Sequence, residues 1–263
     1  MVMVIGAGGI TGLNTITGLS SVSVNSATIG GLTLSGTAIG GLTSTPDLSL
    51  TGRLLSVQSF TAKTNSGDAN ELGTSGGSYT WTKPSGCKYV LVYVTGGGGG
   101  ARVNDGSYRG AGGGGGGTAI KFIDVSGVST VAVTVGEGGS HARNGGRGST
   151  GGTSSFGAYC SATGGQGGQS DVPYEGGPGG SATGGDFNIP GGAGEMAHGA
   201  DREGGGGMSF WHKSGSHHHS ENTSRPWNVH GHLGSGGGQG HYSQNFYYYC
   251  NGGPGVVLVY NYS

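Results

Sequence analysis

The chain of 263 residues contains 67 glycines, and only 10% of its residues are charged, with a formal net charge of −1. The lack of a Lys/Arg cluster argues against nucleic-acid binding, which depends on neutralising phosphates. The lack of a run of about 18 apolar residues argues against membrane insertion. Seven prolines without a three-residue period exclude a collagen triple helix. Three cysteines, an odd number without close spacing, argue against a disulfide framework.

Residues 1–62 form a first compositional zone, rich in Ser, Thr, Ile, Leu and Gly, with no aromatic residue before Phe60. A short motif recurs in it as Ile10-Thr-Gly-Leu13, Ile16-Thr-Gly-Leu19, Ile29-Gly-Gly-Leu32 and Ile39-Gly-Gly-Leu42. Such short repeats cannot each bury an apolar face alone, so they stack or wrap around other chains. The zone therefore predicts short β-strands and turns over residues 1–62, followed by a polar linker over residues 63–78.

Residues 79–263 form a second zone, in which strand-like segments alternate with glycine-rich stretches. β-Branched and aromatic residues predict strands at Tyr79–Thr82, Tyr89–Val94, Ala119–Asp124, Val131–Val135 and Val256–Tyr260. Strands near both ends of the zone thus frame a long glycine-rich insertion. We expect an all-β protein in which this zone is a β-sandwich-like head.

The glycine runs Gly96–Gly100 and Gly112–Gly117 cannot form ordinary helices or central strands, because glycine has no side chain to bury and loses the most backbone entropy on folding. Disordered segments usually combine low hydrophobicity with high net charge. Here apolar strands bracket the runs and the net charge is small. We therefore expect ordered, extended polyglycine segments whose backbone N–H and C=O groups pair between neighbouring segments.

The sequence has no catalytic motif in the structural context that such a motif needs. The stretch Val2-Met-Val-Ile-Gly-Ala-Gly-Gly9 has the form of a dinucleotide-binding turn, but no helical pattern follows it and the first acidic residue is Asp47. The acidic residues are scattered, and no sequence pattern brings together a nucleophile, a base and an orienting group. We expect a protein that is not an enzyme.

Eight of the nine histidines lie between His198 and His241. In a strand, His230 and His232 would project to the same face. Three such pairs around a threefold axis would supply six imidazoles, a cage suited to iron or another first-row divalent ion. The alternative is that these are exposed or stacking histidines in loops, with no cofactor bound.

Aromatic residues gather in the same zone, at Phe210, Trp211, Trp227, Tyr242, Phe246, Tyr247, Tyr248 and Tyr249. Three consecutive aromatic residues cannot all face inward on one strand, so we expect some of them to be exposed. Exposed aromatic rings supply contact area at low entropy cost and serve well in recognition. Alternatively, these rings cap the bare glycine layer.

The sequence Tyr79-Thr-Trp-Thr-Lys-Pro-Ser-Gly86, with the valine-rich strand and glycine run that follow it, resembles the glycine-rich C-terminal domain of bacteriophage tail fibre proteins. The closing strand in Gly252–Tyr260 extends the resemblance, which covers about residues 78–263. The repeats of residues 1–62 look like the N-terminal shafts of such fibres. The resemblance implies a homotrimer that is made in the host cytoplasm, joins the virion tail or baseplate through this attachment region and recognises a bacterial surface receptor. The pair His230 and His232 is similar to the His-x-His iron sites of some phage fibres.

On this basis we expect receptor binding without catalysis. The candidate receptor-binding residues are Trp211, His217, His219, Trp227, Tyr242, Tyr247 and Tyr248. Two alternatives stay open: a purely structural virion protein with the aromatic residues buried between chains, and a glycine-rich ice-binding or cell-wall protein. The latter would need a regular repeat with flat threonine faces or a signal peptide, and the sequence has neither.

Overall fold

The computed structural model of the chain describes residues 52–61, 75–103, 110–143, 145–169, 175–196, 204–213, 231–238 and 250–263. All of these belong to one compact unit, residues 49–263. They form β-strands, turns and extended segments without any helix, and so none of them forms a helix that could cross a membrane.

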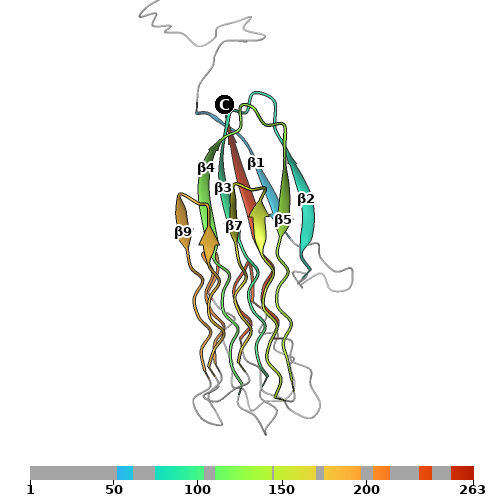
Figure 1. The fold of residues 1–263 in the computed structure, drawn as a ribbon, viewed down its shortest axis with the longest axis vertical. Helices are drawn as coiled ribbons and strands as arrows, with labels where there is room; N and C mark the ends of the chain where they lie inside the picture. Colours follow the sequence, from blue (N-terminus) through green and yellow to red (C-terminus); the bar gives the residue numbers. More distant parts are fainter. Residues whose placement is uncertain are drawn as a thin grey trace, which may run out of the picture. The chain divides into compact units, whose positions relative to one another are not determined.

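Two five-stranded antiparallel sheets form a sandwich at one end of this unit (Figure 1). The β3 sheet has the strand order β1 (Leu54–Thr61), β10 (Val256–Tyr262), β3 (Tyr89–Thr95), β4 (Thr118–Asp124) and β9 (Phe187–Ile189). The β5 sheet has the order β2 (Gly77–Thr82), β5 (Thr130–Val135), β6 (Ser154–Phe156), β7 (Cys160–Ala162) and β8 (Ala182–Thr183). Strands from the two ends of the described chain are therefore neighbours in the β3 sheet.

The sandwich core follows from strict alternation along the long strands. In β3, Val90, Val92 and Val94 are buried, while the residues between them are only half-buried. Strands β5 and β10 bring further valines into the same layer. Because successive side chains on a strand point to opposite faces, one face of each sheet packs into the core.

A buried polar contact joins the two sheets near one end of this core. The Trp81 indole N–H donates to Asn261 Oδ1 over 3.0 Å, and both side chains are fully buried. The Asn261 amide in turn donates to the Ser56 carbonyl oxygen. The Trp81 ring lies edge-on to Phe156, with the centroids 5.8 Å apart. Since the buried indole has its hydrogen-bond partner, it adds packing area without a desolvation penalty.

The glycine-rich stretches continue the strands along the long axis of the unit instead of forming loops (Figure 1). We call them together the glycine lattice: residues 96–103, 111–117, 136–142, 148–152, 163–169, 175–181, 190–196, 204–208, 231–237 and 250–255. Gly96, Gly99 and Arg102 all donate their N–H groups to the segment 111–117. Every third residue thus meets the same neighbour, which is the three-residue turn of the polyproline II conformation.

A segment inside the glycine lattice bonds to six neighbours. Residues 112–117 donate N–H groups to three segments, through Gly114 to Gln166, Gly115 to Gly192 and Gly116 to Gly234. They accept from three others, through Gly177, Gly207 and Gly99. Each of these N···O distances lies between 2.7 and 2.8 Å. Because polyproline II segments make no internal hydrogen bonds, neighbouring segments must satisfy the buried backbone, and here they do.

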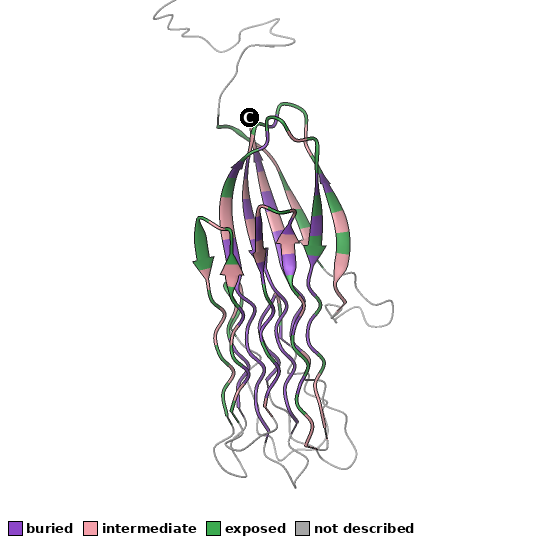
Figure 2. Ribbon diagram, in the orientation of Figure 1, coloured by how far each residue is buried: buried purple, intermediate pink, exposed green. Residues whose placement is uncertain are grey.

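Glycine is required by this packing. A Cβ added at Gly113 would lie 2.0 Å from the Gly99 carbonyl oxygen, and one at Gly116 would lie 2.1 Å from that of Gly96. Inner segments are accordingly buried along their length (Figure 2). On an outer segment, Thr163 and Gln166 are exposed while the glycines between and after them are buried. The prediction of ordered, mutually paired glycine segments is confirmed.

The predicted strands are all present, with boundaries that differ by one to two residues. Two features differ from the sequence analysis. Leu54–Thr61, grouped there with the attachment region 1–62, pairs with β10 as an edge strand of the sandwich. Gly77 and Ser78, assigned to the linker, belong to β2. The short strands β6 to β9 were not predicted, because two or three residues carry almost no periodic signal.

Candidate functional site

The two ends of this unit differ in what they hold. The chain enters the sandwich at Gly52, whose N–H donates to the Ser263 carbonyl oxygen over 2.8 Å, so entry and C-terminus lie together. This is the proximal end (Figure 1). The glycine lattice runs away from it to the distal end, where residues 102, 111, 142, 169, 175, 195, 205, 237 and 250 lie.

Arg102 ties several segments together at the distal end. Its backbone bridges Ala111 on one side and Ala142 on the other. Its side chain is almost fully buried, and the guanidinium donates to the Gln169 carbonyl oxygen over 3.3 Å. A guanidinium has five N–H donors in a fixed plane. Arg102 therefore links three distal segments, two through its backbone and one through its side chain.

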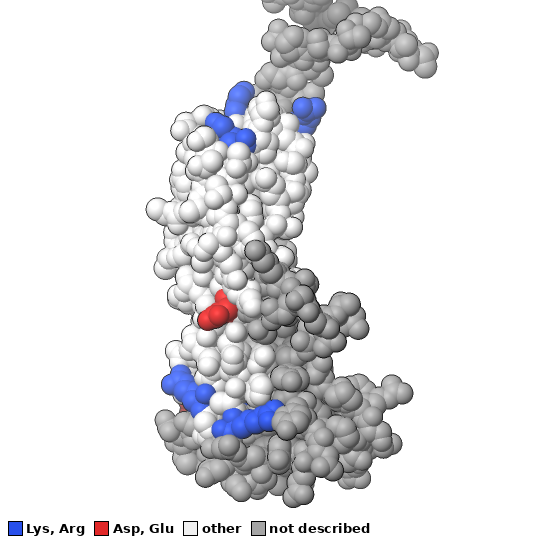
Figure 3. All heavy atoms as spheres, turned by 90° about the vertical axis from the view of Figure 1, so that its right-hand side faces the viewer, with Lys and Arg blue, Asp and Glu red and all other residues white. Residues whose placement is uncertain are grey.

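The sides of the unit carry few charges, whereas its ends carry several. Lys and Arg side chains lie near both ends of the face shown in Figure 3, with a largely uncharged stretch between them. At the distal end, Arg147 donates to the Gln166 side chain over 2.6 Å, and the Glu195 carboxylate accepts from the Gly205 N–H. The described part of the distal end thus presents both signs of charge on rigid backbone.

Trp211 lies where the sandwich meets the glycine lattice. Its indole N–H donates to Thr95 Oγ1 over 2.9 Å, and that hydroxyl lies 2.8 Å from the hydroxyl of Thr118. Its ring packs on Tyr93, with centroids 5.5 Å apart, and on Phe210 at 5.0 Å. Trp211 is half-buried. The structure therefore gives this candidate receptor residue a clear packing role beside the sheet.

A histidine pair lies at the same boundary. The rings of His212 and His232 are 5.1 Å apart between centroids. Removal of part of the ring from water lowers the pKa of His232, and the nearby His212 lowers it further. The backbone around it forms a tight turn in which the Ser235 N–H bonds the His232 carbonyl oxygen and Leu233 has a φ of 40°. Sequence reasoning missed the partner His212, because loop histidines show no spacing signal.

The other predicted site residues lie outside the described residues: His217, His219, Trp227, His230, Tyr242, Tyr247 and Tyr248. The proposed metal pair of His230 and His232 therefore stays a prediction. Among the residues that the structure describes, no group of three or more His, Cys, Asp or Glu side chains is placed to hold a metal ion.

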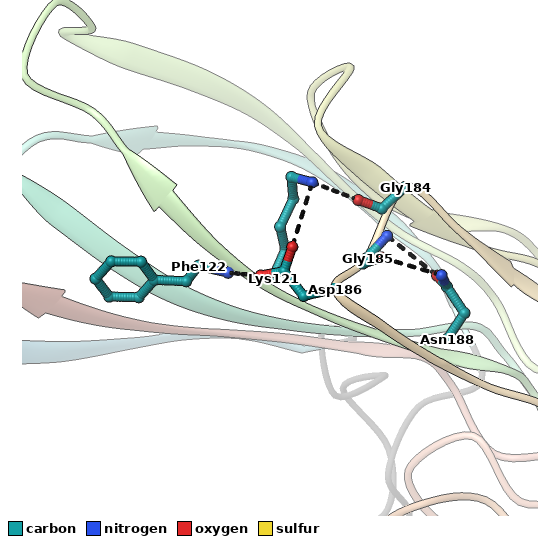
Figure 4. Close-up of polar contacts among 6 residues, drawn as sticks. All are labelled: Lys121, Phe122, Gly184, Gly185, Asp186 and Asn188. Atoms are coloured by element: carbon teal, nitrogen blue, oxygen red, sulfur yellow. Dashed lines mark hydrogen bonds and ion pairs between the residues drawn. The ribbon is translucent and has the colours of Figure 1, made fainter.

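The turn between β8 and β9 connects the edges of the two sheets (Figure 4). Lys121 on β4 donates to the Gly184 carbonyl oxygen over 2.7 Å and lies 3.8 Å from the Asp186 carboxylate. Asp186 also accepts the Phe122 backbone N–H over 2.8 Å. Gly184 has a φ of 75°, a conformation that favours glycine. These contacts hold the turn beside the strands; they assemble no reactive group.

A family model described as a glycine-rich domain matches residues 73–262, which include β2 to β10 and every segment of the glycine lattice. The chain belongs to this glycine-rich domain family. The matched residues leave out β1, although β1 completes the edge of the β3 sheet. Comparison with curated proteins gives no match. The family match thus confirms the expectation of a glycine-rich domain and names no role for it.

Proposed function

We propose that the chain is a bacteriophage tail fibre protein that attaches to the tail through its N-terminal residues and binds a bacterial surface receptor. The observation that carries the proposal is that the entry of the chain and the distal end lie at opposite ends of the unit. The chain enters beside its C-terminus at the proximal end, while the ends of several lattice segments lie together at the distal end. A protein anchored before Gly52 would thus present its distal end outward. The resemblance of residues 78–263 to tail fibre sequences supports the same role.

The glycine lattice suits a binding role because it holds the segment ends rigidly. Val103, Gln169, Met196 and Cys250 belong to lattice segments that end near the distal end. Loops on a rigid scaffold lose less entropy on binding, and this raises affinity without new contacts. We place Tyr242, Tyr247 and Tyr248 among the receptor-binding groups of this end. In a homotrimer, weak contacts of each copy would be multiplied by avidity.

The remaining candidates belong to a different place in the chain. His217, His219 and Trp227 lie between Lys213 and Gly231 in the sequence. The histidines that flank this stretch, His212 and His232, have ring centroids 5.1 Å apart at the sandwich boundary. We propose this stretch as a second, lateral receptor contact. Trp211, which anchors its start against Tyr93, would position it. The proposed mechanism is binding, with no catalytic step.

Adsorption of the labelled full chain to a panel of bacterial strains tests the proposal. Replacing Tyr242, Tyr247 and Tyr248 together by Ser should reduce binding to a responsive strain at least about tenfold, since aromatic groups dominate recognition energies. The matched control replaces Thr80, Thr82 and Thr130 by Ser on the outer face of the β5 sheet and should bind normally. Absence of binding by the wild-type chain to any strain would favour the purely structural virion protein.

A further inference from the structure

The two outer faces of the sandwich have opposite character. On the β5 sheet the outward residues are small and mostly polar: Ser78, Thr80, Thr82, Thr130, Ala132, Thr134, Ser155, Ser161 and Thr183. On the β3 sheet most of them are large and apolar: Val57, Leu258, Tyr260, Tyr262, Tyr89, Leu91, Tyr93, Ile120, Phe122 and Phe187. Ser59 and Thr61 at the β1 margin are small and polar. Asp124 is the one charged residue among the outward residues of the described β3 sheet strands. The outer face of the β5 sheet is thus mostly polar, and that of the β3 sheet mostly apolar.

The apolar face is at the upper end of what a monomer normally exposes. Six large side chains on or beside it are between 46% and 67% exposed: Leu54, Val57, Phe122, Phe187, Met208 and Phe210. At ~150–200 Å² for each side chain, these alone expose about 500–600 Å². Half-buried Tyr93 and Tyr260, whose rings are 5.9 Å apart, add to it. The largest apolar patch on a typical monomer is about 300–600 Å², and a stable interface needs about 800 Å² from each partner.

The occupant that fits best is a second copy of the chain. A surface almost without charge can meet itself without repulsion or unpaired buried ions. The register places Val57, Tyr260, Leu91 and Phe122 in one row across the sheet, from the β1 margin to the β4 margin. If all copies attach through their N-termini, they run in the same direction. A rotation axis along the strands then sets the β1 margin of one copy against the β4 margin of the next, at the same height.

We propose that copies of this chain pack side by side through the outer face of the β3 sheet, with Val57 of one copy opposite Phe122 of the next. The proposal rests on the proposed parallel assembly for its direction. It assigns the surface that holds the copies together, and it leaves the distal end of every copy free. Glycine lattices of neighbouring copies would then lie parallel.

Sedimentation or light scattering of the full chain tests this assignment. Val57→Lys should convert the oligomer to monomer, and so should Phe122→Glu, because each buries an unpaired charge. The double variant should recover the oligomer, since Lys and Glu would then face each other across the interface. Phe187→Glu serves as a second disrupting variant in case Phe122→Glu loses its stacking on Tyr89 and unfolds. Thr134→Lys on the β5 sheet is the matched control and should not change the mass.

A wild-type monomer at micromolar concentration, or an unchanged mass for Val57→Lys, would overturn the proposal. Dissociation of both single variants without recovery in the double variant would overturn the pairing of opposite margins. Cell binding separates this proposal from the receptor proposal. Monomeric Val57→Lys should still bind a responsive strain, with affinity reduced to that of one copy, whereas failure of the receptor proposal would abolish binding and leave the mass unchanged.

Discussion

Replacing Gly114 by alanine tests the packing of the glycine lattice most sharply. The new Cβ would lie 2.1 Å from the Pro178 carbonyl oxygen, about 1 Å closer than atoms normally approach. Gly114 also donates to Gln166 and accepts from Gly99, each over 2.8 Å. Moving the segment aside would cost about 1–3 kcal/mol for overpacking. It would cost about 1–3 kcal/mol more for each buried hydrogen bond that is lost.

If one of these two hydrogen bonds is lost, the expected loss of stability is about 2–6 kcal/mol, which corresponds to a fall in melting temperature of roughly 4–24 °C for a unit of this size. Scanning calorimetry of the wild-type chain and the variant measures it. Gly127→Ala is the matched control, because a Cβ at Gly127 meets nothing within 4 Å. If Gly114→Ala melts within about 2 °C of Gly127→Ala, the segments are not packed backbone to backbone and the reasoning is refuted.

Three further predictions concern the core and its titrating groups. Asn261→Ala should lower the free energy of unfolding in urea by about 2–4 kcal/mol, since it leaves the buried Trp81 N–H without its acceptor. In the double variant with Trp81→Phe, the loss should be smaller than the sum of the two single losses. Strictly additive losses would contradict the pairing of Trp81 with Asn261. The pKa of His232 is lowered in the folded protein, so its contribution to folding stability is present above pH 6.5 and is lost as the pH falls below that value. In melting experiments between pH 7.5 and 5, His232→Gln should therefore reduce the fall in melting temperature with falling pH. An unchanged pH dependence would contradict this prediction. Burial raises the pKa of Cys160 to about 11; the native thiol should therefore resist alkylation at pH 8 until the protein unfolds, and rapid native labelling of Cys160 would show that it is accessible.

Much of the sandwich could be predicted from the sequence, because β3 and β10 carry long runs in which valine alternates with other residues. The pairing of glycine runs could also be predicted, since in a segment without side chains only the backbone N–H and C=O groups need hydrogen-bond partners. The six-neighbour arrangement could not be predicted. A pure glycine run shows no sequence period from which the three-residue repeat of its backbone could be read. That period is visible only on outer segments such as Thr163-Gly-Gly-Gln166, where every third residue is exposed.

The site was harder to predict than the fold. Composition singled out Trp211 as an aromatic residue available for recognition, and the structure shows it bonded to Thr95 and packed on Tyr93. These partners lie far away in the sequence, so no local pattern indicates the contact. The same holds for the apolar face of the β3 sheet. Alternation predicts that one face of each strand is buried, but tyrosine and leucine on the other face look like ordinary strand residues until the register aligns them.

Amide hydrogen exchange of the glycine runs tests the central claim, that the glycine lattice is one hydrogen-bonded body that carries the distal end. The N–H groups of Gly96–Gly100 and Gly112–Gly117 are bonded to neighbouring segments. They should therefore exchange only through large-scale unfolding, with protection close to that of β3. The proximal turn at Gly127 should exchange rapidly. Exchange of the glycine runs at the rate of an unstructured chain, while β3 stays protected, would contradict the account.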